Sequence, residues 1–149
     1  MKPINEMKVT FPSRSANEGF ARAVVASFLS QLDPAVDELS DLRTAVSEAV
    51  TNCIVHAYPD SIGDITVQMR LYENGRTVVK VRDRGCGIEN VEQAMEPLFT
   101  TGGDDRSGLG FSVMESFTDR LKVSSRKGKG TVVTMEKYIV LRERQAKLP

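Results

Sequence analysis

The strongest constraint in this sequence is an apolar pattern of helical period over residues 42–57. The apolar residues form a single stripe that we expect to face the core: Leu42, Val46, Ala49, Val50, Cys53 and Ala57. Glu48 and Asn52 lie one above the other on the same helix, because they are four residues apart. Their face adjoins the stripe, so the pattern predicts a carboxylate and a carboxamide at the margin of the core.

The pair Glu48 and Asn52 has two interpretations. It can belong to a solvated flank of the helix, which is the ordinary meaning of Glu-x-x-x-Asn on its own. It can also be part of a magnesium–nucleotide site, in which the amide oxygen of Asn52 binds the metal and the carboxylate of Glu48 activates a hydroxyl group. The residues downstream decide between the two.

Length and composition favour one domain without metal or disulfide cross-links. The chain has 149 residues, enough to bury a substantial core. We expect a single domain over 1–149, with its core at about 6–138 and a charged tail at 139–149. With two cysteines, no Cys-x-x-Cys and one histidine, neither a zinc site nor a disulfide framework is predicted, and a cytoplasmic location is expected.

The charge balance argues against two classes of partner. Lys plus Arg equals Asp plus Glu at 20 each, so no overall field attracts the chain to nucleic acid or to an acidic membrane. The longest apolar stretch, residues 23–32, is too short to span a bilayer, and the chain does not open with an export signal. We therefore expect no direct contact with nucleic acid and no membrane association.

Alternation of apolar and polar residues predicts the strands. They are residues 7–11, 65–71, 77–83, 121–125 and 131–136. Asn74-Gly75 predicts a type I′ hairpin turn between the second and third of them.

Two capping signals mark the expected starts of the first two helices. Ser15 and Glu18 form a capping box for a helix over about residues 16–32. Asp37 or Ser40 is expected to cap the central helix, which ends near residue 58. The residues of the first helix that we expect to face inward are Phe20, Ala21, Val24, Val25, Phe28 and Leu32.

An acidic residue interrupts the core-facing row of the third strand. Asp83 follows Val79 and Val81 on the same face, where a bare carboxylate is costly unless a group hydrogen-bonds to it. Residues 85–88 follow as a turn whose glycines permit close backbone approach. Residues 89–95 are expected to form a short helix.

Residues 96–110 lose the periodic pattern and form a long, polar, glycine-rich loop. Such loops in compact domains are usually functional lids or disordered. A helix is predicted from about Leu109, with Phe111, Met114 and Phe117 inward. The glycines at its start leave free amide groups, and that end of a helix favours phosphate.

In this order, the features resemble the motifs of the GHKL ATPase superfamily. The matching residues are Glu48 and Asn52 for its N-box, Asp83, Gly85, Gly87 and Ile88 for its first glycine box, Gly108 and Gly110 for its second, and Gly128, Gly130 and Thr131 for its last. No Walker sequence is present, which excludes a P-loop enzyme.

Within this superfamily, the chain looks like the bacterial anti-sigma serine kinases over about residues 6–138. Phosphorelay histidine kinases need an acceptor histidine on a separate helix, whereas the one histidine here, His56, lies in the N-box helix. Topoisomerase and mismatch-repair members need transducer domains, for which the chain has no room. The intact Asp-x-Gly-x-Gly of the first glycine box favours the sporulation branch over the general-stress branch.

The resemblance implies an α/β two-layer sandwich, with a mixed β-sheet whose helices lie on one face and ATP between the helix layer and the lid. It also implies a homodimer that binds a sigma factor and phosphorylates a serine of an anti-anti-sigma protein with ATP and magnesium. A nucleotide-gated binding module with only slow ATPase activity is the alternative. Arg22, to which the residue pattern gives no role, belongs to the partner-binding surface in this family.

Residue chemistry then suggests the roles within the site. Asp83 accepts the adenine amino proton and Thr131 holds a water beside it. Asn52 binds Mg²⁺, Glu48 is the general base and Arg106 neutralises charge on the γ-phosphoryl group. The nucleotide-binding residues are expected to be Asn52, Asp83, Gly85, Gly87, Ile88, Thr100, Thr101, Ser107, Gly108, Leu109, Gly110 and Thr131. Relatives often carry Lys-Pro where this chain has Gly102-Gly103, which leaves Arg106 as the only cation of the lid.

Overall fold

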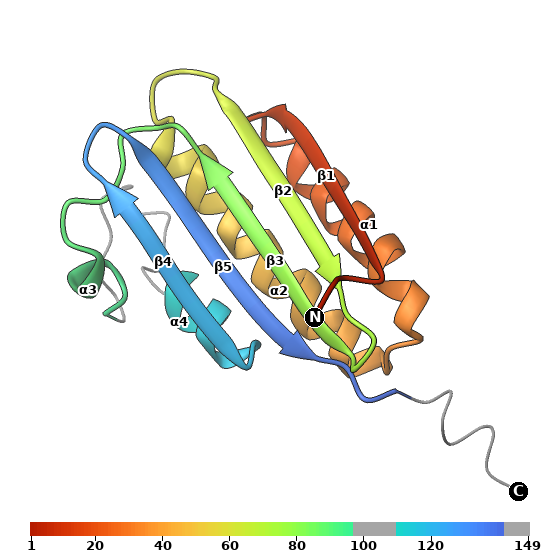
Figure 1. The fold of residues 1–149 in the computed structure, drawn as a ribbon. Helices are drawn as coiled ribbons and strands as arrows, with labels where there is room; N and C mark the ends of the chain where they lie inside the picture. The colour runs from red at the N-terminus through yellow and green to blue at the C-terminus, as the bar shows by residue number, and fades with distance from the viewer. Residues whose placement is uncertain (97–109, 142–149) are drawn as a thin grey trace, which may run out of the picture.

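The computed structural model describes residues 1–96 and 110–141. Five strands form one sheet in the order β1-β2-β3-β5-β4 (Figure 1). The strands are β1 (Asn5–Pro12), β2 (Asp64–Leu71), β3 (Arg76–Asp83), β4 (Arg120–Arg126) and β5 (Gly130–Tyr138). All the predicted strands are confirmed, and the observed strands extend slightly beyond the predicted ends.

The helices cover one face of this sheet (Figure 1). They are α1 (Asn17–Leu29) with a 3₁₀ turn at Ser30–Leu32, α2 (Val36–Asn52) with a π-helical continuation at Cys53–Ala57, α3 (Val91–Ala94) and α4 (Gly110–Ser116). The predicted stripe of α2 packs into the core, where all its residues except the partly buried Ala57 are buried. The two-layer sandwich with helices on one face is therefore confirmed.

The sheet is antiparallel throughout rather than mixed, because each of its four strand pairings is antiparallel. Two helices in succession separate β1 from β2. The second helix returns the chain to the end of the sheet where β1 finishes, so Pro12 at the end of β1 lies opposite Asp64 at the start of β2. A parallel pair would instead need a crossover that begins the next strand at the opposite end.

The predicted helix caps are wrong. The N-cap residue of α1 is Ala16, which makes no side-chain cap, and Glu18 does not close a capping box. The carboxylate of Glu18 instead accepts hydrogen bonds from the hydroxyl groups of Ser47 at 2.8 Å and Thr51 at 3.1 Å, both on α2. The start of α2 also lies earlier than expected, since it begins at Val36. The Glu18 side chain, which the local sequence assigns to the cap of α1, therefore forms a contact between α1 and α2 instead.

Two smaller expectations also differ from the structure. Asn74 does not adopt a positive φ, so the turn before β3 is not type I′; only Gly75 does, with a φ of 89°. The Gly75 amide donates to the Tyr72 carbonyl at 3.0 Å, which makes the turn one residue longer. Phe20 was expected inward but is 46% exposed, and its ring meets Phe11 edge-on with a centroid separation of 5.8 Å.

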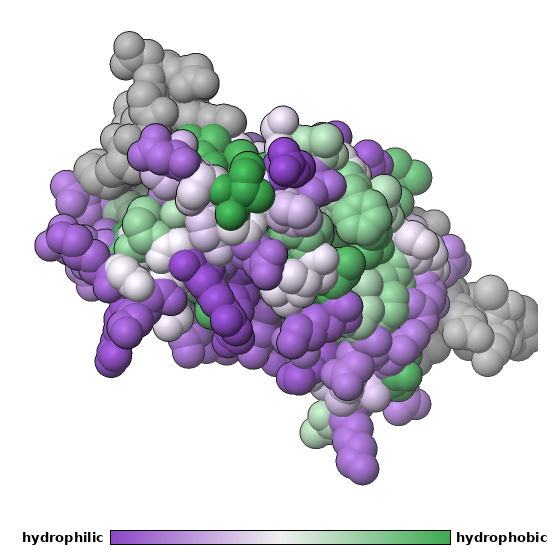
Figure 2. Space-filling model, turned by 90° about the horizontal axis from the view of Figure 1, so that it is seen from above, coloured by the Kyte–Doolittle hydropathy of each residue, from purple (hydrophilic) through white to green (hydrophobic). Residues whose placement is uncertain are grey.

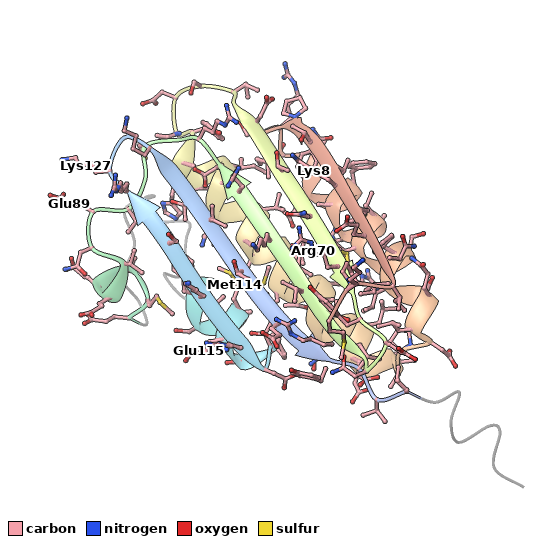
Figure 3. The ribbon with its side chains drawn as sticks, in the orientation of Figure 1. Lys8, Arg70, Glu89, Met114, Glu115 and Lys127 are labelled. Atoms are coloured by element: carbon pink, nitrogen blue, oxygen red, sulfur yellow. The ribbon has the colours of Figure 1, made fainter. Side chains whose placement is uncertain are left out.

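The face of the sheet opposite the helices is open. Lys8 and Arg70 project from it, whereas Met114 of α4 is buried beneath the covered face (Figure 3). Seen from above, the side of the molecule formed by the open face is mainly hydrophilic (Figure 2). This is the ordinary arrangement of an antiparallel sheet with one face in water. Among the described helices, none is long and apolar enough to cross a bilayer.

Candidate active site

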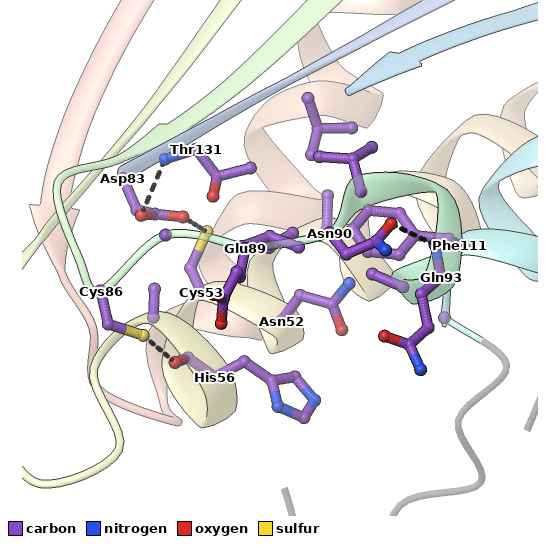
Figure 4. Close-up of a pocket in the computed structure, with 18 of the residues that line it drawn as sticks. Asn52, Cys53, His56, Asp83, Cys86, Glu89, Asn90, Gln93, Phe111 and Thr131 are labelled. Carbon is purple, nitrogen blue, oxygen red and sulfur yellow. Dashed lines mark hydrogen bonds between the residues drawn. The ribbon is translucent and has the colours of Figure 1, made fainter. Parts of the chain in front are cut away.

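A cavity of about 1110 Å³ lies between the end of α2 and the sheet. It is lined by side chains of α2 and its π-helical end, the turn after β3, α3, the start of α4 and the β4–β5 hairpin (Figure 4). Motifs that are far apart in the sequence meet here, as the resemblance implied. Of the predicted site residues, Glu48, Asn52, Asp83, Gly87, Ile88, Gly110 and Thr131 line the cavity.

Asp83, the last residue of β3, forms the floor of the cavity and is 6% exposed. Its Oδ1 accepts the backbone N–H of Gly85 at 2.9 Å and that of Thr131 at 3.2 Å. Its Oδ2 accepts the thiol of Cys53 at 3.5 Å (Figure 4). Burial raises the pKa of Asp83 above the ordinary value, and these three hydrogen bonds oppose that rise. The core-facing position predicted for Asp83 is therefore confirmed, and its hydrogen-bond donors are identified.

Thr131 lies directly opposite Asp83 in the pairing of β3 with β5. Its hydroxyl shares a hydrogen bond of 2.7 Å with the hydroxyl of Ser125 on β4. The Ser125 oxygen also accepts the backbone N–H of Ile88 at 2.7 Å. Ser125 thus ties the turn after β3 to the far edge of the sheet. Sequence reasoning missed this residue, because its partner follows only from the register of the last hairpin.

The turn after β3 is held from two sides. The Cys86 amide donates to the Ala57 carbonyl at 3.1 Å, and the Cys86 carbonyl accepts the Gly128 amide at 2.6 Å. A side chain at Gly85 would overlap the Ala57 backbone, and one at Gly87, which has a φ of 75°, would overlap the carbonyl of Arg126. The close backbone contacts expected of these two glycines are therefore made with other backbone segments of the same protein.

Glu48 and Asn52 are half-buried and face the start of α4. A Cβ atom on Gly110 would lie 3.1 Å from Asn52 Oδ1 and 3.5 Å from Glu48 Oε2. The N-box and the second glycine box are thus in contact. Six other predicted site residues lie outside the described residues: Thr100, Thr101, Arg106, Ser107, Gly108 and Leu109.

The π-helical end of α2 was not predicted. It begins immediately after Asn52 and ends at Ala57, and segments of this kind are often found at functional sites. It presents the carbonyl of His56 to the thiol of Cys86 at 3.0 Å and the carbonyl of Ala57 to the Cys86 amide (Figure 4). Apolar periodicity gives no signal that distinguishes it from an ordinary helical turn.

No cluster of three or more His, Cys, Asp or Glu side chains able to hold a metal ion occurs within residues 1–96 and 110–141. Mg²⁺ in nucleotide sites is usually bound by one or two protein oxygens together with phosphates and water. The amide oxygen of Asn52, at the margin of a large cavity, suits that kind of site. The described residues do not provide enough ligand atoms to bind a metal ion without phosphate or water.

A second, smaller cavity of about 240 Å³ adjoins the first. It is lined by Arg22, Ser40, Arg43, Thr44, Ser47 and Glu48. Glu48 lines both cavities. Arg22 lies 3.8 Å from the carboxylate of Glu18 and is 45% exposed. The proposed general base is therefore reached from a polar, arginine-lined surface as well as from the large cavity.

Comparison with known proteins identifies the family. A family model described as the histidine kinase-like ATPase domain matches residues 11–137. An anti-sigma F factor of Caldanaerobacter subterraneus subsp. tengcongensis is 54% identical over 91% of this chain and 94% of its own length. One from Thermoanaerobacter sp. (strain X514) is 52% identical over 93% of this chain and 97% of its own. The chain belongs to the anti-sigma F factor family.

Membership of the anti-sigma F factor family, with its kinase-like ATPase domain, makes ATP the expected ligand. A crystal structure of the RsbU and RsbW domains of a Mycobacterium tuberculosis protein has the same fold, with a TM-score of 0.67 at 20% identity. That match covers 92% of this chain and 33% of the other. At this identity the likeness shows the fold alone. The sporulation branch favoured by the first glycine box is confirmed by the named relatives.

Proposed function

We propose that this chain binds Mg-ATP in the large cavity, binds and inhibits a sigma factor, and transfers the γ-phosphoryl group to a serine of an anti-anti-sigma protein. The family and its ATPase-type domain support the first part. The observation that carries the proposal is the contact of Glu48 and Asn52 with the start of α4, at one end of a cavity whose other end holds the buried Asp83.

The adenine base binds at the Asp83 end. The two backbone amides occupy Oδ1, so we assign Oδ2 as the acceptor of the 6-amino group. A carboxylate in this position accepts from adenine and repels the carbonyl oxygen that guanine carries at the same place. The Thr131 hydroxyl holds a water molecule beside the base. Gly87 and Ile88 form the adjoining wall, and Gly85 belongs to the same turn and holds the Asp83 carboxylate through its amide.

The phosphates bind at the Glu48 end. Asn52 supplies one oxygen ligand to Mg²⁺, which neutralises phosphate charge when it is bound. Glu48 accepts the proton of the incoming serine hydroxyl. Gly110 has no side chain, which lets the start of α4 lie close against these two residues. We assign the phosphate cradle to the amides of residues 107–110 and charge neutralisation to Arg106, and we include Thr100 and Thr101 among the nucleotide-binding residues. Gly110 is the one of these within the described residues.

The partner surface lies on α1 and α2, around the smaller cavity. Arg22 and Arg43 supply positive charge beside Glu48, so a partner held there can bring a serine to the base. The same surface serves the sigma factor, and the protein acts as a homodimer. The alternative is a nucleotide-gated binding module with only slow ATPase activity.

One experiment separates these functions. The purified chain is mixed with Mg-ATP and, in parallel, with an anti-anti-sigma protein of the sporulation type, one of the general-stress type, or no acceptor. Phosphate on a serine of the sporulation acceptor, located by mass spectrometry, supports the proposal. ATP hydrolysis without transfer to either acceptor would leave the binding module as the function.

A further inference from the structure

The two oxygens of the Asp83 carboxylate are satisfied in different ways. Oδ1 accepts two backbone amides, from Gly85 at 2.9 Å and Thr131 at 3.2 Å. Both amides belong to fixed elements of the backbone, so they set the orientation of the carboxylate without further help. Oδ2 accepts only the Cys53 thiol, at 3.5 Å, among the described residues.

A buried carboxylate oxygen needs a donor when no nucleotide is bound. Asp83 is 6% exposed and Cys53 is 4% exposed, and an unsatisfied buried acceptor is costly. No polar side-chain atom buried in the described part of the chain lacks a partner. For Oδ2, the thiol provides that partner.

A thiol is a weak hydrogen-bond donor, and this decides how easily Asp83 Oδ2 can exchange it for another donor. A thiol ordinarily keeps its proton at neutral pH, so Cys53 can donate there. Cys53 also lines the large cavity beside Asp83 (Figure 4). The bond to Oδ2 is long and weak, so a stronger donor arriving from the cavity can replace it at little cost.

We propose that the Cys53 thiol is a stand-in donor that satisfies Asp83 Oδ2 in the nucleotide-free protein and yields this oxygen to the adenine amino group. This inference rests on the proposed adenine site and adds a determinant of ATP affinity within it. Cys53 is a positioning residue in this account, because it acts on the base through Asp83.

The stand-in role predicts in which direction loss of the thiol changes the preference for ATP over a nucleotide without the amino group. Without the thiol, Oδ2 is unsatisfied until ATP binds, so ATP is favoured more strongly over that nucleotide. Cys53→Ala should therefore increase the preference for ATP over a nucleotide without the amino group. A thiol that merely oriented Asp83 would give the opposite sign, because its loss would weaken the contact with adenine.

The matched variants are Cys53→Ala and Cys53→Ser. Both remove the sulfur atom, and only serine keeps a donor. The matched ligands are ATP and purine riboside triphosphate, which lacks the 6-amino group. Their affinities are measured by calorimetry on the wild type and both variants. The ratio of the two dissociation constants cancels any packing loss that affects both ligands equally.

We expect the preference for ATP to rise about 3- to 10-fold in Cys53→Ala relative to both the wild type and Cys53→Ser, the range expected for one hydrogen bond. We also expect ATP to raise the melting temperature more in Cys53→Ala than in Cys53→Ser. An equal preference in all three proteins would overturn the inference, as would a lower preference in Cys53→Ala. A wild type that binds neither nucleotide would instead refute the proposed function, and one that binds both equally would refute the adenine role of Asp83.

Discussion

Among single residues, Glu48 is the one that both cavities share. It is half-buried, lines both cavities and faces the glycine at the start of α4. We predict that Glu48→Gln keeps ATP affinity within a few-fold but slows phosphorylation of the acceptor about 10²- to 10⁴-fold, the usual contribution of a general base. Single-turnover phosphorylation and ATP titration measure the two effects. Transfer at a near-normal rate would show that Glu48 is structural or only electrostatic.

Asp83 gives the second prediction at this scale. Asp83→Asn should weaken ATP binding strongly, because an amide replaces one acceptor oxygen with a donor and removes the negative charge. The fold should survive, since Asn is nearly isosteric and its remaining oxygen can still accept the two backbone amides of Gly85 and Thr131. Calorimetry with ATP, together with circular dichroism as a check of folding, tests this. An unchanged ATP affinity would mean that the adenine base binds elsewhere.

For whole elements, the sequence was informative where burial follows a simple period. The strict alternation of β2, the alternation in the second half of β3 and the apolar stripe of α2 each predict an element and its buried face. Asp83 was identifiable because it breaks the apolar row of β3. These features depend on a few neighbouring residues, so they are visible without the tertiary structure.

The features that were missed depend on contacts between distant elements. Glu18 appeared to cap α1 but binds Ser47 and Thr51 across the helix pair. The π-helical turn at Cys53–Ala57 has the same apolar period as an α-helix over so short a length. Ser125 reaches Thr131 and Ile88 only because β4 pairs with β5 in one register. Local pattern does not specify any of these contacts.

The turn after β3 yields a prediction about an element. Gly87 and Gly128 have similar φ values of 75° and 79°, but a side chain at Gly87 would overlap the Arg126 carbonyl, whereas one at Gly128 would meet nothing within 4 Å. Gly128→Ala should cost only the penalty for a left-handed residue, about 1–2 kcal/mol. Gly87→Ala should destabilise the fold by more than this and also weaken ATP binding, because the turn must move away from the hairpin. Urea unfolding and ATP titration of both variants test this prediction. Equal losses of stability and of ATP affinity in the two variants would mean that the contact of Gly87 with the hairpin is unimportant.

Across the whole molecule, charge is unevenly distributed although the formal net charge is zero. One cross-strand row on the open face runs Lys8, Gln68, Lys80, Thr134, Lys122. This row carries three lysines and no acidic residue. Two copies of the chain would repel each other if they met through these rows, so the homodimer that we propose should use a different surface.

The α1–α2 side offers a different kind of surface, and the last prediction concerns it. Arg22 is 45% exposed, its nearest acidic partner is Glu18 at 3.8 Å, and it lines the small cavity that Glu48 shares. An exposed ion pair of this length contributes little to folding. The guanidinium group can therefore form paired hydrogen bonds with a carboxylate of a partner protein.

We predict that Arg22→Ala loses about 2 kcal/mol or more of binding to the sigma factor, to the anti-anti-sigma protein, or to both. ATP affinity should not change, because Arg22 is not among the described residues that line the large cavity. Arg82→Ala is the matched control, since Arg82 is an exposed arginine on the open face of the sheet. Surface plasmon resonance measures partner binding and calorimetry measures ATP binding for both variants. Equal partner affinities in Arg22→Ala and the control would show that Arg22 is only a solvated charge, and a drop in ATP affinity would place it in the nucleotide site.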